Sequence, residues 1–350
     1  MRRLLTKHLT ICMLLSSLIV SVGPLTAWAD ESGIWPVKGK LVSNKGDKSK
    51  NVSGIACTRT DKFPRACLVI DDNMQAAQFV TVKDGELRAG DQVPLIDNQF
   101  GGEPLELDGE GVAYADGSFY VMGSHGHPRD KKKKLNPTRD AEEISARIAA
   151  SSQIIRIHIK STTAAALTKN DILDIQRSSK LRKIIGADPL LNRFLDRRLE
   201  NNGVTIEGVA VLGDRLFAGF RGPTLENGRS PILSVTLGGL FATEPAEPRL
   251  ILLPLGEGRG VRDLSPLNDG LLILAGPTGD DAGPYGVYWW NAASGNLHFL
   301  ADITKATAAT AQQKPEAILP LEQGPSGLRV VILSDGSKEG TPRAVLIPSP

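Results

Sequence analysis

A two-strand unit recurs five times along the chain, and this repeat limits the fold more than any other feature of the sequence. Each copy begins with a polar or charged residue, continues as a short apolar strand, turns at Gly, Asp or Asn, and returns as a second apolar strand with a polar end. A third candidate strand follows every copy, and a fourth follows some of them. The copies are VSGIACTRTDKFPRACLVIDD from Val52, GEGVAYADGSFYVMGSHG from Gly109, IEGVAVLGDRLFAGFRGP from Ile206, VRDLSPLNDGLLILAGPTG from Val261 and PEAILPLEQGPSGLRVVILSDGS from Pro315.

Four-stranded units arranged around an axis form a β-propeller. We therefore predict an all-β chain with five blades, and six blades are the alternative if the long second unit contains a degenerate blade. Successive copies begin about 55 residues apart, except after the second copy. The excess there looks helical, because Asp140 is a candidate N-cap with Glu143 three residues later and Gly203 is a candidate stop signal. We predict helical or basic insertions at about 128–152 and 162–202, both in the second blade.

The two ends of the chain are expected to meet in one blade. The last unit lacks a fourth strand, while residues 34–42 after the N-terminal segment form an unassigned strand. A propeller closed in this way has no exposed strand edge at the junction. We therefore predict that residues 34–42 complete the last blade.

The N-terminus has the pattern of a cleavable secretory signal. A basic start precedes an apolar run from Leu9 to Val22, and Ala27 and Ala29 supply the small residues of a cleavage site. The run is shorter than the ~20 residues of a spanning helix, which disfavours a membrane anchor. We predict a signal peptide at residues 1–29 with cleavage near Ala29, a single propeller domain at residues 30–350, and a periplasmic or secreted protein.

Cysteine usage agrees with export. Cys12 belongs to the predicted signal, so the mature chain keeps Cys57 and Cys67. Aligned with the second copy of the repeat, these residues fall at facing positions on either side of a hairpin turn. An oxidising compartment favours a disulfide between them, and two free thiols are the alternative.

The charge balance points to no nucleic acid. The formal net charge of the whole chain is +2, and the basic run Lys131–Lys134 lies between two prolines, as expected for a solvated insertion loop. We expect a monomer with no nucleic-acid partner and no membrane anchor.

The charged residues at the ends of the repeated hairpins are the candidate site. Because the two strands of a hairpin are antiparallel, the start of the first strand lies beside the end of the second, so all copies should place these residues around one channel mouth. Carboxylates there suit Ca²⁺ or Mg²⁺, and arginines suit a phosphate or carboxylate. The alternative is that the charges only pair with one another. The candidate ligand-binding residues are Asp72, Glu110, His125, Glu207, Arg221, Arg262 and Glu316.

Two further groups are weighed at this mouth. His125 and His127, two apart at a strand end, could ligate a transition metal. Asp280 and Asp281 in GPTGDDAGP are interpreted as turn residues.

The ordered motifs EGVA, GSHG, NNGVTIEGVAV, FRGP, VRDL, LAGP and SDGS resemble a bacterial family of secreted β-propeller-like proteins, domain of unknown function 3616, over almost the whole mature chain. The resemblance implies a propeller and no established activity. At the level of fold, the repeat is also similar to phytase-like esterases and other six-bladed propellers. The chain departs from the repeat at Ser53, where an acidic residue is expected, and SDGS holds a single Asp, which weakens a carboxylate-rich metal site.

Three functions remain open at this point. We predict binding of a small polar or anionic ligand at the channel mouth; a metal-dependent phosphoester or ester hydrolase and a protein-interaction scaffold are the alternatives. The sequence contains no G-x-S-x-G elbow, no P-loop and no G-x-G-x-x-G after a strand. Whether the protein is an enzyme, and which residues would be catalytic, is left open.

Overall fold

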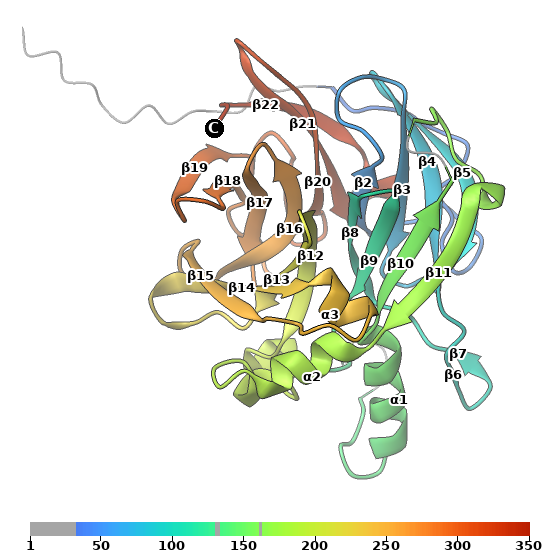
Figure 1. The fold of residues 1–350 in the computed structure, drawn as a ribbon, viewed down its shortest axis with the longest axis vertical. Helices are drawn as coiled ribbons and strands as arrows, with labels where there is room; N and C mark the ends of the chain where they lie inside the picture. Colours follow the sequence, from blue (N-terminus) through green and yellow to red (C-terminus); the bar gives the residue numbers. More distant parts are fainter. Residues whose placement is uncertain (1–32, 130–133, 161–162) are drawn as a thin grey trace, which may run out of the picture.

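Five β-sheets surround a common axis, as the repeat predicted (Figure 1). The structure is a computed structural model that describes residues 33–129, 134–160 and 163–350. The predicted signal peptide and most of the basic run, residues 131–133, lie outside these residues. The innermost strands β2, β8, β12, β16 and β20 pack side by side in a closed ring. The arrangement is a five-bladed β-propeller.

The strands follow the repeat order within each blade. Blade 1 contains β2 (Val52–Cys57), β3 (Arg65–Asp71), β4 (Ala76–Lys83), β5 (Glu86–Pro94) and an added β1 (Val37–Lys38). Blade 2 contains β8 (Gly109–Ala115), β9 (Ser118–Gly123), β10 (Ile154–Ile159) and β11 (Ile172–Ser178). Blade 3 contains β12 (Thr205–Leu212), β13 (Arg215–Gly222), β14 (Arg229–Thr236) and β15 (Arg249–Pro254). Blade 4 contains β16 (Arg259–Leu267), β17 (Gly270–Pro277), β18 (Gly286–Asn291) and β19 (Leu297–Asp302). Blade 5 contains β20 (Lys314–Gly324), β21 (Gly327–Asp335) and β22 (Arg343–Ile347), and a small hairpin of β6 (Gln99–Phe100) and β7 (Glu103–Pro104) joins blades 1 and 2.

Glycines of the repeat allow the inner strands to approach closely. A Cβ on Gly54 would lie 2.9 Å from the Cα of Gly111, and one on Gly208 would lie 2.8 Å from Cγ of Leu264. A side chain at these positions would therefore push neighbouring blades apart. In the fourth copy Asp263 occupies the position, and its carboxylate accepts a hydrogen bond from the Ile318 amide of the next blade at 2.8 Å.

The apolar core is divided into five clusters, one between each pair of neighbouring blades. Two neighbouring blades contribute the two walls of each cluster, so every blade buries both of its faces. This division explains why the inner strands read as nearly continuous apolar runs. The fold positions the mouth by stacking these blades rather than by a single central core.

The N-terminal strand lies in a different blade from the one predicted. β1 pairs in parallel with β5 at the outer edge of blade 1, whereas the residues just before it reach the last blade, where Ile34 bridges to Arg343 and the Trp35 amide donates to the Pro342 carbonyl at 2.8 Å. The reason is the burial of Trp35 and Leu41, which fill the core between blades 5 and 1. The segment therefore crosses from one blade to the next, and the last blade keeps three strands.

The insertions of the second blade are confirmed in part. Helix α1 (Ala141–Ser151) lies in the first predicted insertion, and α2 (Lys180–Ala187) lies in the second. The stretch Ile172–Ser178 is not helical, because it forms β11 and completes the blade. Helix α3 (Leu237–Phe241) follows β14, and short 3-10 turns occupy residues 169–171, 192–194, 199–201, 226–228 and 338–340.

Two further expectations can be compared with the structure. Cys57 and Cys67 face each other on β2 and β3 and form the predicted disulfide. No helix in the described ranges is long and apolar enough to cross a membrane.

Candidate functional site

A β-bulge at the same place in every inner strand positions the mouth residues. In each blade the pairing register between the first two strands skips one residue. A bulge leaves its extra residue outside the ladder and re-aims the side chain. The skipped residues are Ser53, Glu110, Glu207, Arg262 and Glu316.

Four of these residues join Arg221 in one continuous chain of contacts. Nη1 of Arg221 lies 2.8 Å from Oε1 of Glu207, and Oε2 of Glu207 lies 2.9 Å from Nε of Arg262. Nη2 of Arg262 donates to Oε1 of Glu316. Ser53 donates to the other oxygen of Glu316 at 3.3 Å. Residues more than two hundred positions apart in sequence therefore meet at one mouth, as the hairpin argument predicted.

Burial makes these pairs interdependent. The side chain of Arg262 is 0% exposed and that of Glu207 is 3% exposed. Burial lowers the pKa of Arg262, but the negative charges of Glu207 and Glu316 outweigh it and hold that pKa above its usual value. Each arginine thus serves carboxylates of the protein itself. Neither guanidinium is presented to solvent as a free anion site.

Asp280 is a functional candidate that the sequence did not reveal. Its carboxylate forms ion pairs with Nη2 of Arg221 at 3.1 Å and with Nζ of Lys314 at 2.8 Å. It also pairs closely with Arg129 of the blade 2 insertion. Burial would raise its pKa, but Lys314 and Arg129 hold that pKa well below the usual range. The interpretation of Asp280 as a turn residue was incomplete, since its side chain ties blades 2, 3 and 5 to its own loop in blade 4. The sequence did contain one signal for a role of Asp280 beyond the turn, because it is an acidic residue in a glycine-rich loop at the predicted mouth.

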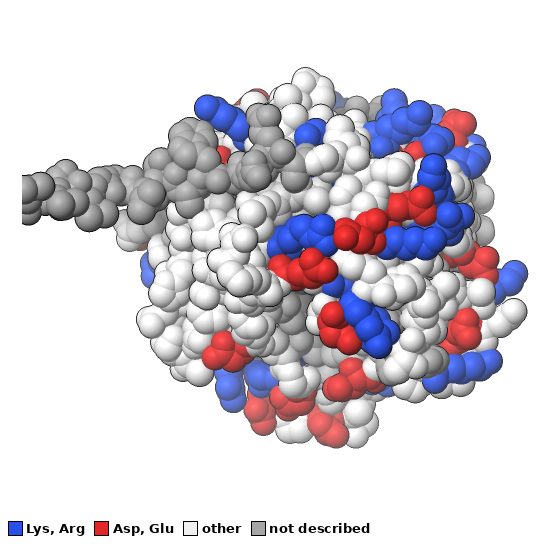
Figure 2. All heavy atoms as spheres, turned by 90° about the horizontal axis from the view of Figure 1, so that it is seen from above, with Lys and Arg blue, Asp and Glu red and all other residues white. Residues whose placement is uncertain are grey.

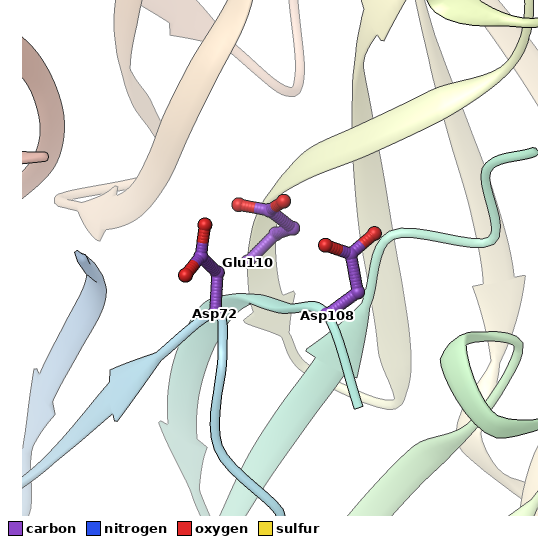
Figure 3. Close-up of side chains that lie close together, drawn as sticks. All are labelled: Asp72, Asp108 and Glu110. Atoms are coloured by element: carbon purple, nitrogen blue, oxygen red, sulfur yellow. The ribbon is translucent and has the colours of Figure 1, made fainter. Parts of the chain in front are cut away.

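A cluster of three carboxylates lies at the other side of the mouth. Ligand oxygens of Asp72, Asp108 and Glu110 all lie within 4.8 Å of one another. Figure 3 shows the three side chains converging from the end of β3 and the start of β8. Asp72 and Asp108 are half-buried and Glu110 is buried. Hard oxygen ligands in such a group match the preference of Ca²⁺ or Mg²⁺.

The electrostatics of this cluster favour a positive charge. Burial raises the pKa of Glu110 well above its usual range, and the carboxylates of Glu207, Asp108 and Asp72 raise it further. Burial likewise raises the pKa of Asp72, with Asp108 the next cause. A cation at the cluster would stabilise the ionised form of each group.

Asp108 was not predicted as a site residue, because the other copies of the repeat carry different residues at its position. Asn51, Thr205, Gly260 and Lys314 stand two residues before the bulge, where the second copy has Asp108. Alignment of the copies therefore gave no acidic pattern at this place.

His125 is not part of the carboxylate cluster. Its Nδ1 lies 2.8 Å from the Gly123 carbonyl, and its own carbonyl accepts from Arg182 of the insertion. Burial lowers the pKa of His125 to about 4, so the ring is neutral. Within the described ranges, neither His125 nor His127 joins a convergent group of metal ligands. Their role as a transition-metal pair stays a prediction.

The closed ring of five blades, with bulged polar residues around one mouth, defines a five-bladed β-propeller protein. More particularly, residues 67–341 match the model of the family described as "Protein of unknown function (DUF3616)". The chain belongs to this family. No curated protein matches it.

Several solved structures are similar to the chain at low identity. A hypothetical protein from Leishmania major has 11% identity and a TM-score of 0.43, with 92% of this chain and 90% of that chain covered. An exo-β-1,3-galactanase from Clostridium thermocellum has 14% identity and a TM-score of 0.45, with 91% and 63% covered. A β-fructofuranosidase mutant from Bombyx mori, in complex with sucrose, has 10% identity and a TM-score of 0.41, with 91% and 61% covered. The chain thus spans less than two thirds of the length of these two glycosidases.

Proposed function

We propose that the protein is a binding propeller whose channel mouth holds a divalent cation at Asp72, Asp108 and Glu110, and through it a small polar or anionic ligand. The observation that carries the proposal is the position of Glu110 in the ring of bulged residues. Ser53, Glu207, Arg262 and Glu316 are joined by hydrogen bonds or ion pairs, whereas the described residues offer the Glu110 carboxylate no donor. A buried carboxylate without a donor is costly when ionised, and a cation removes that cost.

The same geometry favours a cation over a bare anion as the first occupant. Arg221 and Arg262 are both occupied by carboxylates of the protein. An anionic ligand would have to displace one of these buried pairs, which is unfavourable because a buried charge would be left unpaired. A bound Ca²⁺ or Mg²⁺ with open positions would instead accept an oxygen of the ligand.

Export and oligomeric state complete the proposal. The disulfide between Cys57 and Cys67 supports an oxidising compartment. We infer that the protein acts as a monomer after export, in the periplasm or outside the cell.

Calorimetric titration of the metal-stripped full chain with CaCl₂ and with MgCl₂ tests the cation site. We expect saturable binding of at least one cation, weakened at least about tenfold by Glu110→Gln or Asp72→Asn, since each removes a charged ligand. Asp116→Asn is the matched control, because Asp116 lies at the opposite end of β8 and its positive φ suits Asn. Absence of binding to the wild-type protein, or equal weakening by the control, would contradict the proposal.

A second titration separates binding from catalysis. The cation-loaded protein is screened against small phosphorylated and carboxylated compounds, and each compound is then checked for turnover. A ligand that binds only with the cation present and is recovered intact supports the binding propeller. Hydrolysis of a phosphoester or ester that stops in Glu110→Gln would instead establish the hydrolase alternative.

A further inference from the structure

A cleft lies on the insertions of blade 2. It has a volume of about 920 Å³. One wall is residues 134–139 with His127, and the other is residues 196–201. Small-molecule sites commonly measure about 300–1,000 Å³, so this cleft has room for a ligand larger than a single inorganic ion.

The two walls of the cleft are joined to each other. Nη2 of Arg198 donates to the Leu135 carbonyl at 3.0 Å, and Nε of Arg129 lies 3.1 Å from Oε1 of Glu200. Leu135 and Leu199 are buried and anchor the walls in the interior. The cleft is therefore a built feature of the insertions, not the accidental gap between two independent loops.

More basic than acidic side chains line the cleft. Four basic side chains and one carboxylate line it: Lys134, Arg139, Arg197, Arg198 and Asp196. The carboxylate of Asp196 is engaged by Arg182 at 2.7 Å, and Arg139 is paired with Asp140 at 2.7 Å. Lys134 and Arg197 have no acidic partner among the described residues. By contrast, the face seen from above in Figure 2, away from α1 and α2, shows positive and negative side chains next to one another.

We propose that this cleft is a binding site for a multivalent anion, a molecule that carries two or more phosphate or carboxylate groups. Guanidinium groups match either anion through paired hydrogen bonds, and the Lys134 ammonium adds a mobile point charge. Arg197 stacks on Phe194, with its guanidinium carbon 5.2 Å from the ring centre, and this contact restricts the orientation of the side chain. The site lies outside the carboxylate cluster of the mouth, and it requires no cation.

Calorimetry on the full chain, stripped of metal and then dialysed free of EDTA because EDTA is itself a multivalent carboxylate, tests the cleft with tripolyphosphate and with citrate as probes. We expect saturable binding of at least one probe, weaker at high chloride because the contacts are ionic. The double variant Lys134→Ala/Arg197→Ala should weaken binding at least about tenfold. Preference for tripolyphosphate identifies a phosphate ligand, and preference for citrate identifies a carboxylate ligand.

Arg193→Ala is the matched control for Arg197. Arg193 stacks on the same Phe194 ring at 5.1 Å but does not line the cleft. Its removal deletes the same charge and the same stacking contact, so it should change affinity by less than about twofold. Equal weakening by Arg193→Ala would show general charge attraction and overturn the proposal, as would the failure of both probes to bind.

A further variant keeps this proposal distinct from the cation site. Glu110→Gln should bind the anionic probes like wild type, since the cleft does not include the mouth carboxylates. Loss of anion binding in that variant would place the anion at the mouth and overturn the cleft assignment. Failure of the cation titration would leave the anion result unaffected.

Discussion

Arg262 is the residue on which the charge balance of the mouth most depends. It is buried without solvent exposure between Glu207 and Glu316, which come from the blades on either side. Its guanidinium therefore compensates two carboxylates at once. The pairing serves the architecture, because a buried carboxylate is costly to ionise without a counter-charge.

We expect Arg262→Met to destabilise the protein by about 3–5 kcal/mol, because buried Glu316 loses its counter-charge and Glu207 keeps only Arg221. Urea unfolding at neutral pH measures the change. Arg259→Met is the control, since Arg259 lies on the same strand but is only half-buried and bonds the Tyr288 hydroxyl. A loss no larger than that of the control would show that the pairs contribute little.

Glu110 gives a second residue-scale prediction, on pH. Burial raises its pKa in the folded protein, whereas the unfolded chain titrates near 4. Protonation therefore favours the folded state, and this stability is present at low pH and lost as pH rises through the folded pKa. Glu110→Gln is neutral throughout, so in EDTA its stability relative to wild type should rise from about pH 5 to about pH 8, by up to about 1.4 kcal/mol per pH unit.

Urea unfolding of both proteins across that range checks the slope. Burial of neutral His125, whose pKa falls to about 4, acts in the opposite direction, but it is common to both proteins and cancels in the difference. A difference that stays constant with pH would mean that Glu110 titrates normally. Excess Ca²⁺ or Mg²⁺ should reverse the order of stability, because the wild type binds the cation more tightly than Glu110→Gln and is stabilised more by it.

Among the elements, the two-residue strand β1 contributes to the stability of the fold through the residues just before it. Trp35, just before it, is 7% exposed and Ile34 is 56% exposed. Trp35→Ala should cost about 3–5 kcal/mol, because it empties part of the core between blades 5 and 1. Ile34→Ala should cost no more than about 0.5 kcal/mol. Thermal and urea unfolding measure the difference in stability between the two variants. Similar losses of stability would mean that burial of Trp35 does not hold blades 5 and 1 together.

The β2–β3 hairpin carries the disulfide across a sequence separation of 10. Intact-mass analysis after alkylation without reduction should show no modified cysteine in the mature folded protein. The double variant Cys57→Ala/Cys67→Ala should lose about 2–3 kcal/mol, as a short loop closure predicts. Reduction before alkylation is the control and should give two adducts, whereas two adducts without reduction would contradict the bond.

The elements also separate what sequence could predict from what it could not. Inner strands such as β12 were found because both faces are buried and their apolar runs repeat. β11 was mistaken for helix because Ile172 and Ile175 are spaced like a helical face, while an outer strand with few buried side chains shows no strict alternation. At the site, the bulge residues were predictable from the repeat, but Asp108 and Asp280 belong to loops that the other copies do not share.

At the scale of the whole molecule, the loops of the mouth are joined through Asp280. It receives Arg129 from the blade 2 insertion, Arg221 from blade 3 and Lys314 from blade 5, while its own loop belongs to blade 4. One carboxylate thus connects four of the five blades at their polar ends. Away from the mouth, neighbouring blades are held mainly by the interblade cores.

Asp280→Asn should therefore loosen the mouth without opening the ring. We expect faster hydrogen exchange at residues 197–204 and 278–284, with the inner strands unchanged, and a loss of about 1–2 kcal/mol, because three cations lose one shared partner whose side chain is partly exposed. Asp281→Asn is the control, since Asp281 is the exposed neighbour in the same loop and loses the same charge. Equal exchange in the two variants would mean that the loops are held by their backbones. Faster exchange confined to Asp280→Asn would show that this carboxylate holds the insertion, and with it the basic cleft, against the mouth.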